Sequence, residues 1–309
     1  MKLCSFAKYA LTITMGAAML AACSSNGGSS LAPSGVSSGM PGITHIGTGA
    51  YQYISDFGNG ATVEFDYPKS DASIGSISGV TEAQGECTNA LFGSGKKTFW
   101  VTASGTDQID EFKVGGTSPI KSLSVPSGDI PVGCAMDPST GNLVATIINN
   151  GAVVIYKKPS GKGTVSQTPL IEASFAGFDK GGNLYVDGLN SNNAFGFVEL
   201  KEGGSRWKTL SLSNSASGGP VQYDGKYVTI NDQQARAIYG YACSGTTCTL
   251  KRTVSLVCGG QSWIAKGYVI CPDAGNLDAE IYKYPAGGSP IATLTGSFSE
   301  PLGAVQVEK

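Results

Sequence analysis

Acidic and amide side chains beside short strand-like runs are the residues of this chain best suited to chemistry. Carboxylate and amide oxygens are the ligands that Ca²⁺ and similar hard cations prefer, so several of them converging on one axis would form a metal site. The same side chains also stabilise turns by bonding to nearby backbone groups, and both interpretations stay open here. Asp107, Asn150 and Asp278 belong to this set. The candidates for a polar binding face are Asp56, Glu86, Asn149, Asp187, Asn231, Asp232, Gln261 and Asp273.

Nucleophilic catalysis has little support in the composition. The chain has one histidine, His45, in a Ser/Gly/Pro-rich segment, so a Ser-His-Asp or Cys-His arrangement is excluded from the rest of the chain. The many glycines occupy turn-like positions and do not precede a helix, which argues against a phosphate-binding loop. Trp100, Trp207 and Trp263 would stack on sugars if exposed, but their alternating strand positions predict that most of them pack in a core.

A repeat of about 41 to 46 residues organises the chain beyond its first 48 residues. Each unit contains a short strand-like run that ends near an aromatic or other bulky residue and is followed by a Gly/Pro/Ser turn. A period of this length with β character is typical of propeller blades, each a four-stranded sheet. The sequence therefore predicts an all-β fold, a six-bladed β-propeller. The anchors of the repeat are Tyr67, Phe112, Lys158, Leu200, Tyr241 and Tyr284.

The segment 179–187, with the sequence Asp-Lys-Gly-Gly-Asn-Leu-Tyr-Val-Asp, resembles an NHL-type repeat. The NHL consensus combines an Asp, a Gly-Asn turn and an aliphatic-aromatic strand, and two or three of the blades here match it well. Gluconolactonase-like propellers share this blade count, bind a divalent metal and use it for lactone hydrolysis. That resemblance implies a rival function as a metal-dependent hydrolase or lyase. Its ligands would be Glu86, Asn149, Asn231 and Asp273.

The two ends of the repeat region are expected to meet in one blade. Residues 301–307 form an inner strand with no partner after it, whereas residues 50–56, 61–67 and 73–78 form three strands with no inner strand before them. Joining them closes the ring and removes the free sheet edges. In such a ring, the loops between blades and those between the second and third strands share one face. The polar candidates fall in or beside these loops.

Six cysteines remain after the N-terminal region, which suggests disulfides in an exported chain. Cys243 and Cys248 flank a short turn and should join the two strands of one hairpin. Cys258 and Cys271 bracket the next hairpin. The last pair, Cys87 and Cys134, occupies equivalent places in consecutive blades and should join neighbouring inner strands. A zinc site is the alternative, but Cys-x₄-Cys without a nearby histidine matches no common zinc spacing.

The N-terminal sequence is typical of an export signal. Basic residues precede an apolar run over residues 9–20 that is too short to span a membrane. The sequence Leu20-Ala21-Ala22-Cys23 resembles the lipobox of bacterial lipoproteins, in which the cysteine becomes the lipidated first residue of the mature chain. We therefore predict a signal peptide over 1–22, a flexible Gly/Ser/Pro tether over 23–48 and the propeller over 49–309. Ser24 carries no inner-membrane retention signal, which favours the outer membrane or cell surface.

These features favour a lipid-anchored, extracytoplasmic propeller that acts as a non-catalytic binding module at the cell envelope. Its partner would be an envelope protein, a peptide or a glycan. Charged residues make up 14% of the chain and the net charge is −2, with no basic stripe, so nucleic acid is not an expected partner. No cofactor is firmly implied, and Ca²⁺ or another divalent metal is the one that the rival function would require.

Overall fold

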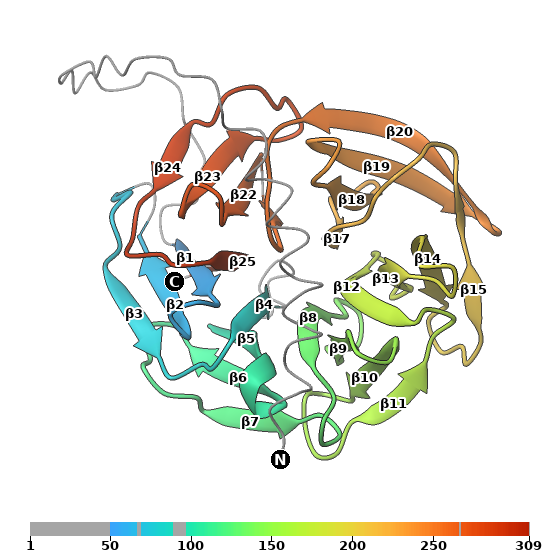
Figure 1. The fold of residues 1–309 in the computed structure, drawn as a ribbon, viewed down its shortest axis with the longest axis horizontal. Helices are drawn as coiled ribbons and strands as arrows, with labels where there is room; N and C mark the ends of the chain where they lie inside the picture. The colour runs from blue at the N-terminus through green and yellow to red at the C-terminus, as the bar shows by residue number, and fades with distance from the viewer. Residues whose placement is uncertain (1–49, 67–68, 89–96, 266, 309) are drawn as a thin grey trace. The chain divides into compact units, whose positions relative to one another are not determined.

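The computed structural model describes residues 50–66, 69–88, 97–265 and 267–308, and all of its sheets belong to one ring (Figure 1). The predicted signal peptide and tether, with Cys23 and His45, lie outside the described residues. Six sheets surround a central axis, and each sheet counts as one blade. Among the described residues the single helical element is a 3₁₀ turn, Ser104–Thr106, and no helix there is long and apolar enough to cross a membrane. The predicted six-bladed β-propeller is confirmed.

The blades are numbered here from the one that contains the chain ends, and strands are given from the axis outward. Blade 1 contains β25 (Pro301–Glu308), β1 (Ala50–Asp56), β2 (Ala61–Phe65) and β3 (Gly75–Ser78). Blade 2 contains β4 (Ala83–Cys87), β5 (Thr98–Ala103), β6 (Gln108–Lys113) and β7 (Lys121–Ser124). Blade 3 contains β8 (Pro131–Met136), β9 (Leu143–Ile147), β10 (Ala152–Tyr156) and β11 (Thr164–Gln167).

The second half of the ring follows the same order. Blade 4 contains β12 (Glu172–Phe178), β13 (Leu184–Leu189), β14 (Phe195–Leu200) and β15 (Trp207–Thr209). Blade 5 contains β17 (Val221–Tyr223), β18 (Val228–Asp232), β19 (Ala237–Ser244), β20 (Thr247–Ser255) and the short β16 (Ser211–Leu212). Blade 6 contains β21 (Trp263–Ala265), β22 (Tyr268–Asp273), β23 (Asp278–Lys283) and β24 (Ala292–Leu294).

Blade 1 closes the ring as predicted. The C-terminal strand β25 pairs antiparallel with β1 over the whole length of β1, from Ala50 opposite Glu308 to Asp56 opposite Pro301. Strands β2 and β3 complete the sheet. Because the N-terminal and C-terminal strands share one sheet, the ring has no free inner edge at the place where the chain ends.

Strand β16 departs from the expected blade boundary. The sequence pattern places residues 208–212 in the last strand of one blade, but in the structure Ser211 and Leu212 pair in parallel with Thr247 and Cys248 of the next blade. The β19–β20 hairpin continues beyond Tyr241, the last residue of β19 that pairs with β18, and its outer strand β20 leaves backbone groups to be paired there. The segment arriving from blade 4 satisfies them, since the Ser211 N–H donates to Thr246 O at 2.8 Å.

All three predicted disulfides are present. Cys87–Cys134 joins the inner strands of blades 2 and 3 across a sequence separation of 47 residues. Cys243–Cys248 links the two strands of the β19–β20 hairpin, and Cys258–Cys271 ties the segment before β21 to β22. By loop-closure entropy the first of these, which closes the longest loop, should stabilise the fold most, by about 4 kcal/mol.

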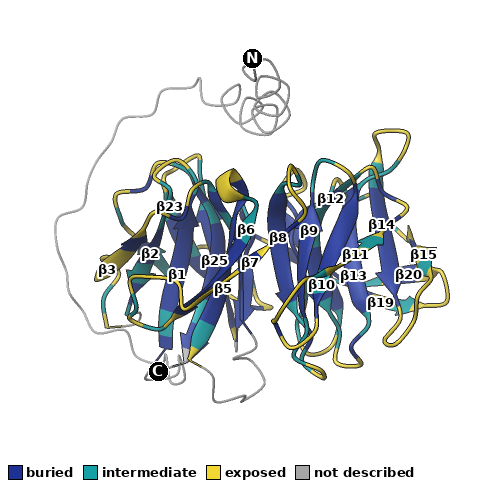
Figure 2. Cartoon of the chain, turned by 90° about the horizontal axis from the view of Figure 1, so that it is seen from below, coloured by how far each residue is buried: buried dark blue, intermediate teal, exposed yellow. Residues whose placement is uncertain are grey.

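The core lies between the blades, where the inner strands are buried, whereas exposed residues lie in the loops and on outermost strands such as β3 (Figure 2). Tyr53 of blade 1 stacks on Phe99 of blade 2 with ring centroids 4.0 Å apart. The expectation that most tryptophans pack in the core is confirmed, since Trp100 and Trp263 are buried. Trp207 is half-buried, and its Nε1–H donates to Ser166 Oγ of the neighbouring blade at 3.0 Å.

Glycines let the inner strands approach one another around the axis. A Cβ on Gly133 would lie 2.6 Å from Ser174 O of the next blade, and a Cβ on Gly177 would lie 2.6 Å from Val221 O. Both are closer than a carbon can approach a carbonyl oxygen. The same close approach recurs at Gly85, Gly260 and Gly303. These glycines in and beside the inner strands are therefore required by packing, which explains why ligand-type side chains are scarce there.

Candidate functional site

Asp56 occupies the predicted polar face, where it ties the closing strand to its own blade. Its carboxylate accepts hydrogen bonds from Asn59 Nδ2 at 2.6 Å, from Ser299 N at 3.0 Å and from Glu300 N at 2.7 Å. The last two residues lie in the loop that leads into β25. Asp56 therefore orients that loop, which is the role that the turn-stabilising interpretation predicts.

Asn149 performs the same role for the loop that leads into β8. Its Oδ1 accepts from Ile130 N at 3.1 Å, and its Nδ2 donates to Gly128 O at 2.8 Å. Asp107 holds the same loop from the preceding blade by accepting from Gly128 N at 3.0 Å. Asn150 donates to Asp129 Oδ1 at 2.8 Å. The oxygen atoms of Asn149 and Asp107 therefore accept from the backbone of the loop before β8.

Asp187 is fully buried between blades 4 and 5. Its two oxygens accept from Phe175 N at 2.9 Å and from Gly219 N at 2.8 Å. Burial raises the pKa of Asp187 to about 7, against the opposing effect of these hydrogen bonds. Asp232 and Asp273 are the last residues of β18 and β22, the second strands of blades 5 and 6. Asp232 accepts from Ser217 N at 2.8 Å, and Asp273 accepts from Gly275 N at 2.8 Å within its own turn.

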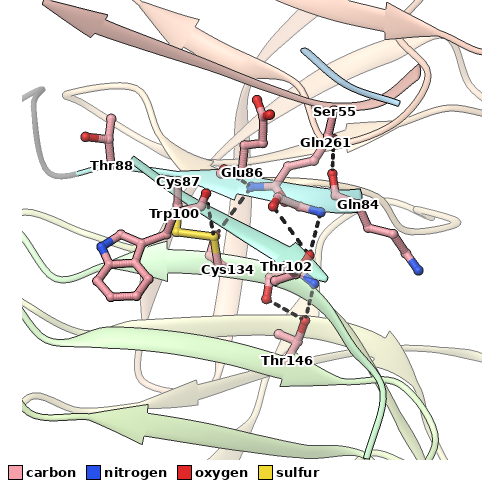
Figure 3. The surroundings of a disulfide bond; sticks show 12 residues. Ser55, Gln84, Glu86, Cys87, Thr88, Trp100, Thr102, Cys134, Thr146 and Gln261 are labelled. Atoms are coloured by element: carbon pink, nitrogen blue, oxygen red, sulfur yellow. Dashed lines mark hydrogen bonds between the residues drawn. A yellow bond between two sulfur atoms is a disulfide. The ribbon is translucent and has the colours of Figure 1, made fainter. Parts of the chain in front are cut away.

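Glu86 is the exception among the predicted candidates. It is fully buried in β4, and in Figure 3 its side chain points away from the Cys87–Cys134 disulfide. Neither carboxyl oxygen has a hydrogen-bond partner of normal geometry among the described residues. Burial raises the pKa of Glu86 well above its ordinary value, and the nearby Thr62 hydroxyl lowers it by less. The uncharged form of the Glu86 carboxyl is therefore favoured in the fold relative to the unfolded chain.

The four side chains proposed as metal ligands each lie in a different environment. Glu86 is buried between blades, and Asn149 bonds to the loop that leads into β8. Asp273 bonds within its own turn, and Asn231 directs its Nδ2 at Ser262 Oγ, 3.4 Å away. Within the described ranges, no group of three or more His, Cys, Asp or Glu side chains is arranged to hold a metal ion. The donor set inferred from the gluconolactonase resemblance therefore does not fit a metal, and no catalytic step is derived through one.

Gln261 links four blades at the axis, a role that the sequence does not reveal. Its backbone N–H donates to Leu302 O at 2.5 Å and its carbonyl accepts from Ala304 N at 2.8 Å, both in blade 1. Its side-chain Nε2 donates to Glu86 O at 2.8 Å and to Cys134 O at 3.4 Å, in blades 2 and 3 (Figure 3). Gln261 itself precedes β21 of blade 6. The side chain therefore crosses the central axis.

A cavity of about 50 Å³ lies against Gln261, on the side toward the C-terminal ends of the inner strands. This is the face opposite the predicted polar one. Its wall includes the last residues of β8, β12 and β17, which are Met136, Phe178 and Tyr223. The buried Trp263 completes the wall, and its Nε1–H has no hydrogen-bond partner within the described part of the chain. This cavity is the candidate functional site.

The sequence contains one signal that points to this cavity. Met136, Phe178 and Tyr223 each immediately precede the aspartate that opens the repeat's first turn, and these aspartates are Asp137, Asp179 and Asp224. Each carboxylate accepts backbone N–H groups of that turn, as Asp179 does from Gly181 N at 2.8 Å. Because the repeat determines where this turn lies in each blade, it also places the residue before the aspartate at the end of the inner strand, near the axis.

A larger hollow of about 480 Å³ lies elsewhere, beside β14 and the segment that carries β16. Its wall includes Leu170, Phe197 and Leu210. Among its described lining residues, Asn214 Oδ1 is buried without a hydrogen-bond partner, but the Asn214 side chain as a whole is only half-buried. The central cavity differs from it in holding such groups, which is why we assign the site to the axis.

Comparisons with known proteins support the fold and do not show a family. No protein-family model matches the chain, and no curated protein matches it. Among solved structures, a chain of the nidogen–laminin complex aligns with a TM-score of 0.67 at 12% identity, covering 84% of this chain and 98% of that one. A protein of unknown function from Bacteroides caccae aligns with a TM-score of 0.63 at 11% identity, covering 84% and 100%. A functionally unknown protein from Desulfotomaculum acetoxidans aligns with a TM-score of 0.57 at 10% identity, covering 84% and 99%. The chain is thus similar in fold to propellers of diverse origin.

Proposed function

We propose that this protein is a non-catalytic binding module, a lipid-anchored propeller outside the cytoplasm that engages a partner at the cell envelope. The observation that carries the proposal is the central cavity, where Trp263 Nε1–H has no partner within the described residues and aromatic side chains form the wall. Unpaired buried polar groups are rare in folded proteins and call for an explanation. The partly exposed side chains of Met136, Phe178 and Tyr223 in the cavity wall are the surface that a partner would contact.

The location rests on the sequence of the N-terminus and on the disulfides. Cys23 would carry the lipid, and residues 23–48 would tether the propeller to the outer membrane or cell surface. Three disulfides are typical of proteins that fold in an oxidising compartment, which supports export. The partner would be an envelope protein, a peptide or a glycan.

The hydrogen bonds of the polar-face residues also favour a binding module over the rival hydrolase or lyase. Asp56, Asn149, Asp187 and Asp232 accept backbone N–H groups of the loops around the inner strands. Rigid loops of this kind hold the inner strands in place, so the cavity on the opposite face keeps its shape while a partner docks. A metal-dependent reaction would instead need several of these oxygens free to converge on one ion.

Elemental analysis of the full-length protein tests the proposal against the metal-dependent alternative. The protein would be purified in detergent from an oxidising compartment and dialysed without chelator. We expect no stoichiometric Ca²⁺, Zn²⁺ or Mn²⁺, and no rise in melting temperature when these ions are added. About one equivalent of metal, lost in both Glu86→Gln and Asp273→Asn while the fold persists, would contradict the binding module and favour the enzyme.

A further inference from the structure

The charged side chains of the propeller are divided between its two faces. The loops at the C-terminal ends of the inner strands, where the central cavity lies, form what we call the cavity face. Every blade places an exposed lysine in or beside a loop of this face. One from each blade, in order from blade 1 to blade 6, they are Lys69, Lys97, Lys158, Lys180, Lys226 and Lys283.

The opposite face is acidic. In its loops, Arg236 is the only basic residue within the part of the chain that the structure describes. The net charge of −2 for the whole chain therefore conceals one basic and one acidic face. The sequence shows no basic stripe because the lysines lie far apart along the chain and come together only in the ring. The acidic residues in or beside the loops of the opposite face include Glu82, Asp107, Asp129, Asp273, Asp278 and Glu300.

Most lysines of the cavity face have no acidic partner. Lys69 Nζ lies 3.3 Å from Asp66 Oδ2 in an exposed ion pair. Among the described residues, no ion pair involves Lys97, Lys180 or Lys226. These three lysines stand in the first loop of their blades, next to the axis, so their positive charge surrounds the cavity.

The aspartates in the same turns direct their carboxylates into the protein. Asp179 accepts backbone N–H groups of its own turn, and Asp224 does the same and also pairs with Arg252. In the described loops of the cavity face, the exposed acidic residues are Asp71 and Glu202. The cavity face therefore has an excess of exposed positive charge.

The arrangement of this charge indicates the kind of partner that it fits. The lysines are distributed around the whole ring, so they do not line a single groove. A lysine is a point charge and lacks the planar fork with which arginine binds one carboxylate or phosphate group in a fixed geometry. A matching partner presents negative charge over a broad area without a fixed geometry. The anionic headgroups of a lipid bilayer do so, and they attract nearby lysines.

The chain enters the propeller on the same face. Ala50, the first residue of β1, pairs with Glu308, the last residue of the inner strand β25. Because β25 ends at the cavity face, the segment 23–48 proposed as the tether joins the ring there. A lipid on Cys23 would therefore connect the membrane to the basic face of the propeller.

We propose that the cavity face lies on the anionic headgroups of the membrane that carries the lipid anchor, and that its lysines hold it there. The partner at the cavity is then a component of that membrane surface. The proposal rests on the proposed function, because it uses the lipid anchor and the binding face assigned there.

Lysine acetylation of the full-length lipidated protein on vesicles tests the proposal. One set of vesicles is phosphatidylcholine, and the other also contains about 30% phosphatidylglycerol. Peptide mass spectrometry measures how fast each lysine reacts with acetic anhydride. Lys208 of β15 and Lys251 of β20 are internal controls, because both are exposed on outer strands.

We expect Lys97, Lys180 and Lys226 to react about threefold or more slowly on the anionic vesicles than on the neutral ones. Lys208 and Lys251 should react at the same rate on both. Salt at about 0.5 M should remove the difference, because added ions screen exposed charges.

Two sets of glutamine substitutions separate the basic face from the total charge. The variant Lys97→Gln/Lys180→Gln/Lys226→Gln should lose most of the slowing at Lys283. The matched variant Lys208→Gln/Lys251→Gln should keep it. All five positions are exposed, so the fold should persist in both variants.

Three results would overturn the proposal. They are equal reaction rates of the cavity-face lysines on both kinds of vesicle, equal slowing of Lys208 and Lys251, and slowing by soluble polygalacturonate without slowing by anionic vesicles. The last result would indicate an acidic glycan as the partner of this face. The anchor is tested separately, because a protein without the lipid would not float with the neutral vesicles.

Discussion

At the residue scale, the polar side chains proposed from the sequence as binding residues fall into two groups. Asp56, Asp187 and Asp232 accept backbone N–H groups from loops that lead into inner strands, so their charge is used to build the ring. Glu86 is buried with no ionic or hydrogen-bonded partner of normal geometry among the described residues. The residue type alone does not tell a carboxylate that accepts backbone N–H groups from one that has no partner. The difference depends on which backbone groups the fold places beside the carboxyl.

Glu86 should make the stability of the protein depend on pH. The pKa of Glu86 is raised in the folded state. The contribution of this carboxyl to the stability of the fold is therefore fully present below the unfolded pKa of about 4.5, and it is lost as the pH rises through the folded pKa. Each unit of that shift corresponds to about 1.4 kcal/mol. We expect the wild type to lose stability relative to Glu86→Gln between pH 4.5 and pH 8. Urea unfolding at both pH values measures the difference.

The control for this prediction is Glu202→Gln, a substitution at an exposed turn. Its stability relative to the wild type should change little between the two pH values. If Glu86→Gln instead parallels the wild type at both pH values, the carboxyl is not held neutral in the fold.

At the scale of the element, packing of the inner strands depends on glycine. Gly303 of β25 has no room for a side chain, since a Cβ would lie 2.1 Å from Gln84 O and 2.4 Å from Ser55 Oγ. The contact is with the backbone of the adjacent blade, which cannot move away without opening the ring. The same logic applies to the other inner-strand glycines that face a carbonyl.

Gly303→Ala should therefore destabilise the protein by about 1–3 kcal/mol, the usual cost of forcing an extra group into a packed core. Gly75→Ala is the matched control, because it also lies in a strand of blade 1 but meets only Glu64 Oε2 at 3.4 Å. Thermal unfolding of the two variants compares them. Equal melting temperatures would mean that the inner strands separate easily.

The elements could be predicted from the sequence because their signals are local. The repeat period, the Gly-Asn turn after Asp179 and the spacing of the six cysteines all act within one blade or between consecutive blades. The parallel strand β16 was missed because it depends on how far β20 extends. The central cavity was missed because its wall comes from five blades, and the Gln261 side chain contacts a carbonyl 175 residues away in the sequence.

At the scale of the whole molecule, closure by β25 joins the two ends of the chain into one cooperative ring. The strand pairs along the full length of β1, and its backbone at Leu302 and Ala304 also bonds to Gln261. It therefore supports both the other strands of blade 1 and Gln261, the residue that crosses the axis. Loss of this strand should affect the central cavity as well as the blade.

Deletion of residues 301–309 should abolish cooperative unfolding or lower the melting temperature strongly, because it exposes the β1 edge and removes both partners of the Gln261 backbone. Limited proteolysis and thermal unfolding measure the change. Addition of a synthetic peptide with the sequence of residues 299–309 should restore part of the protection. A deletion variant that unfolds like the full chain would contradict closure through β25.

The central claim is that the protein binds its partner through the cavity at the axis. Photo-crosslinking in intact cells tests it most directly, with benzoylphenylalanine placed at Phe178 in the cavity wall and, as a control, at Ile120 on the exposed outer edge of blade 2. The account predicts a specific adduct from position 178, lost in a Trp263→Phe background, and no matching adduct from position 120. Crosslinking from the outer edge alone, with none from the cavity, would contradict it.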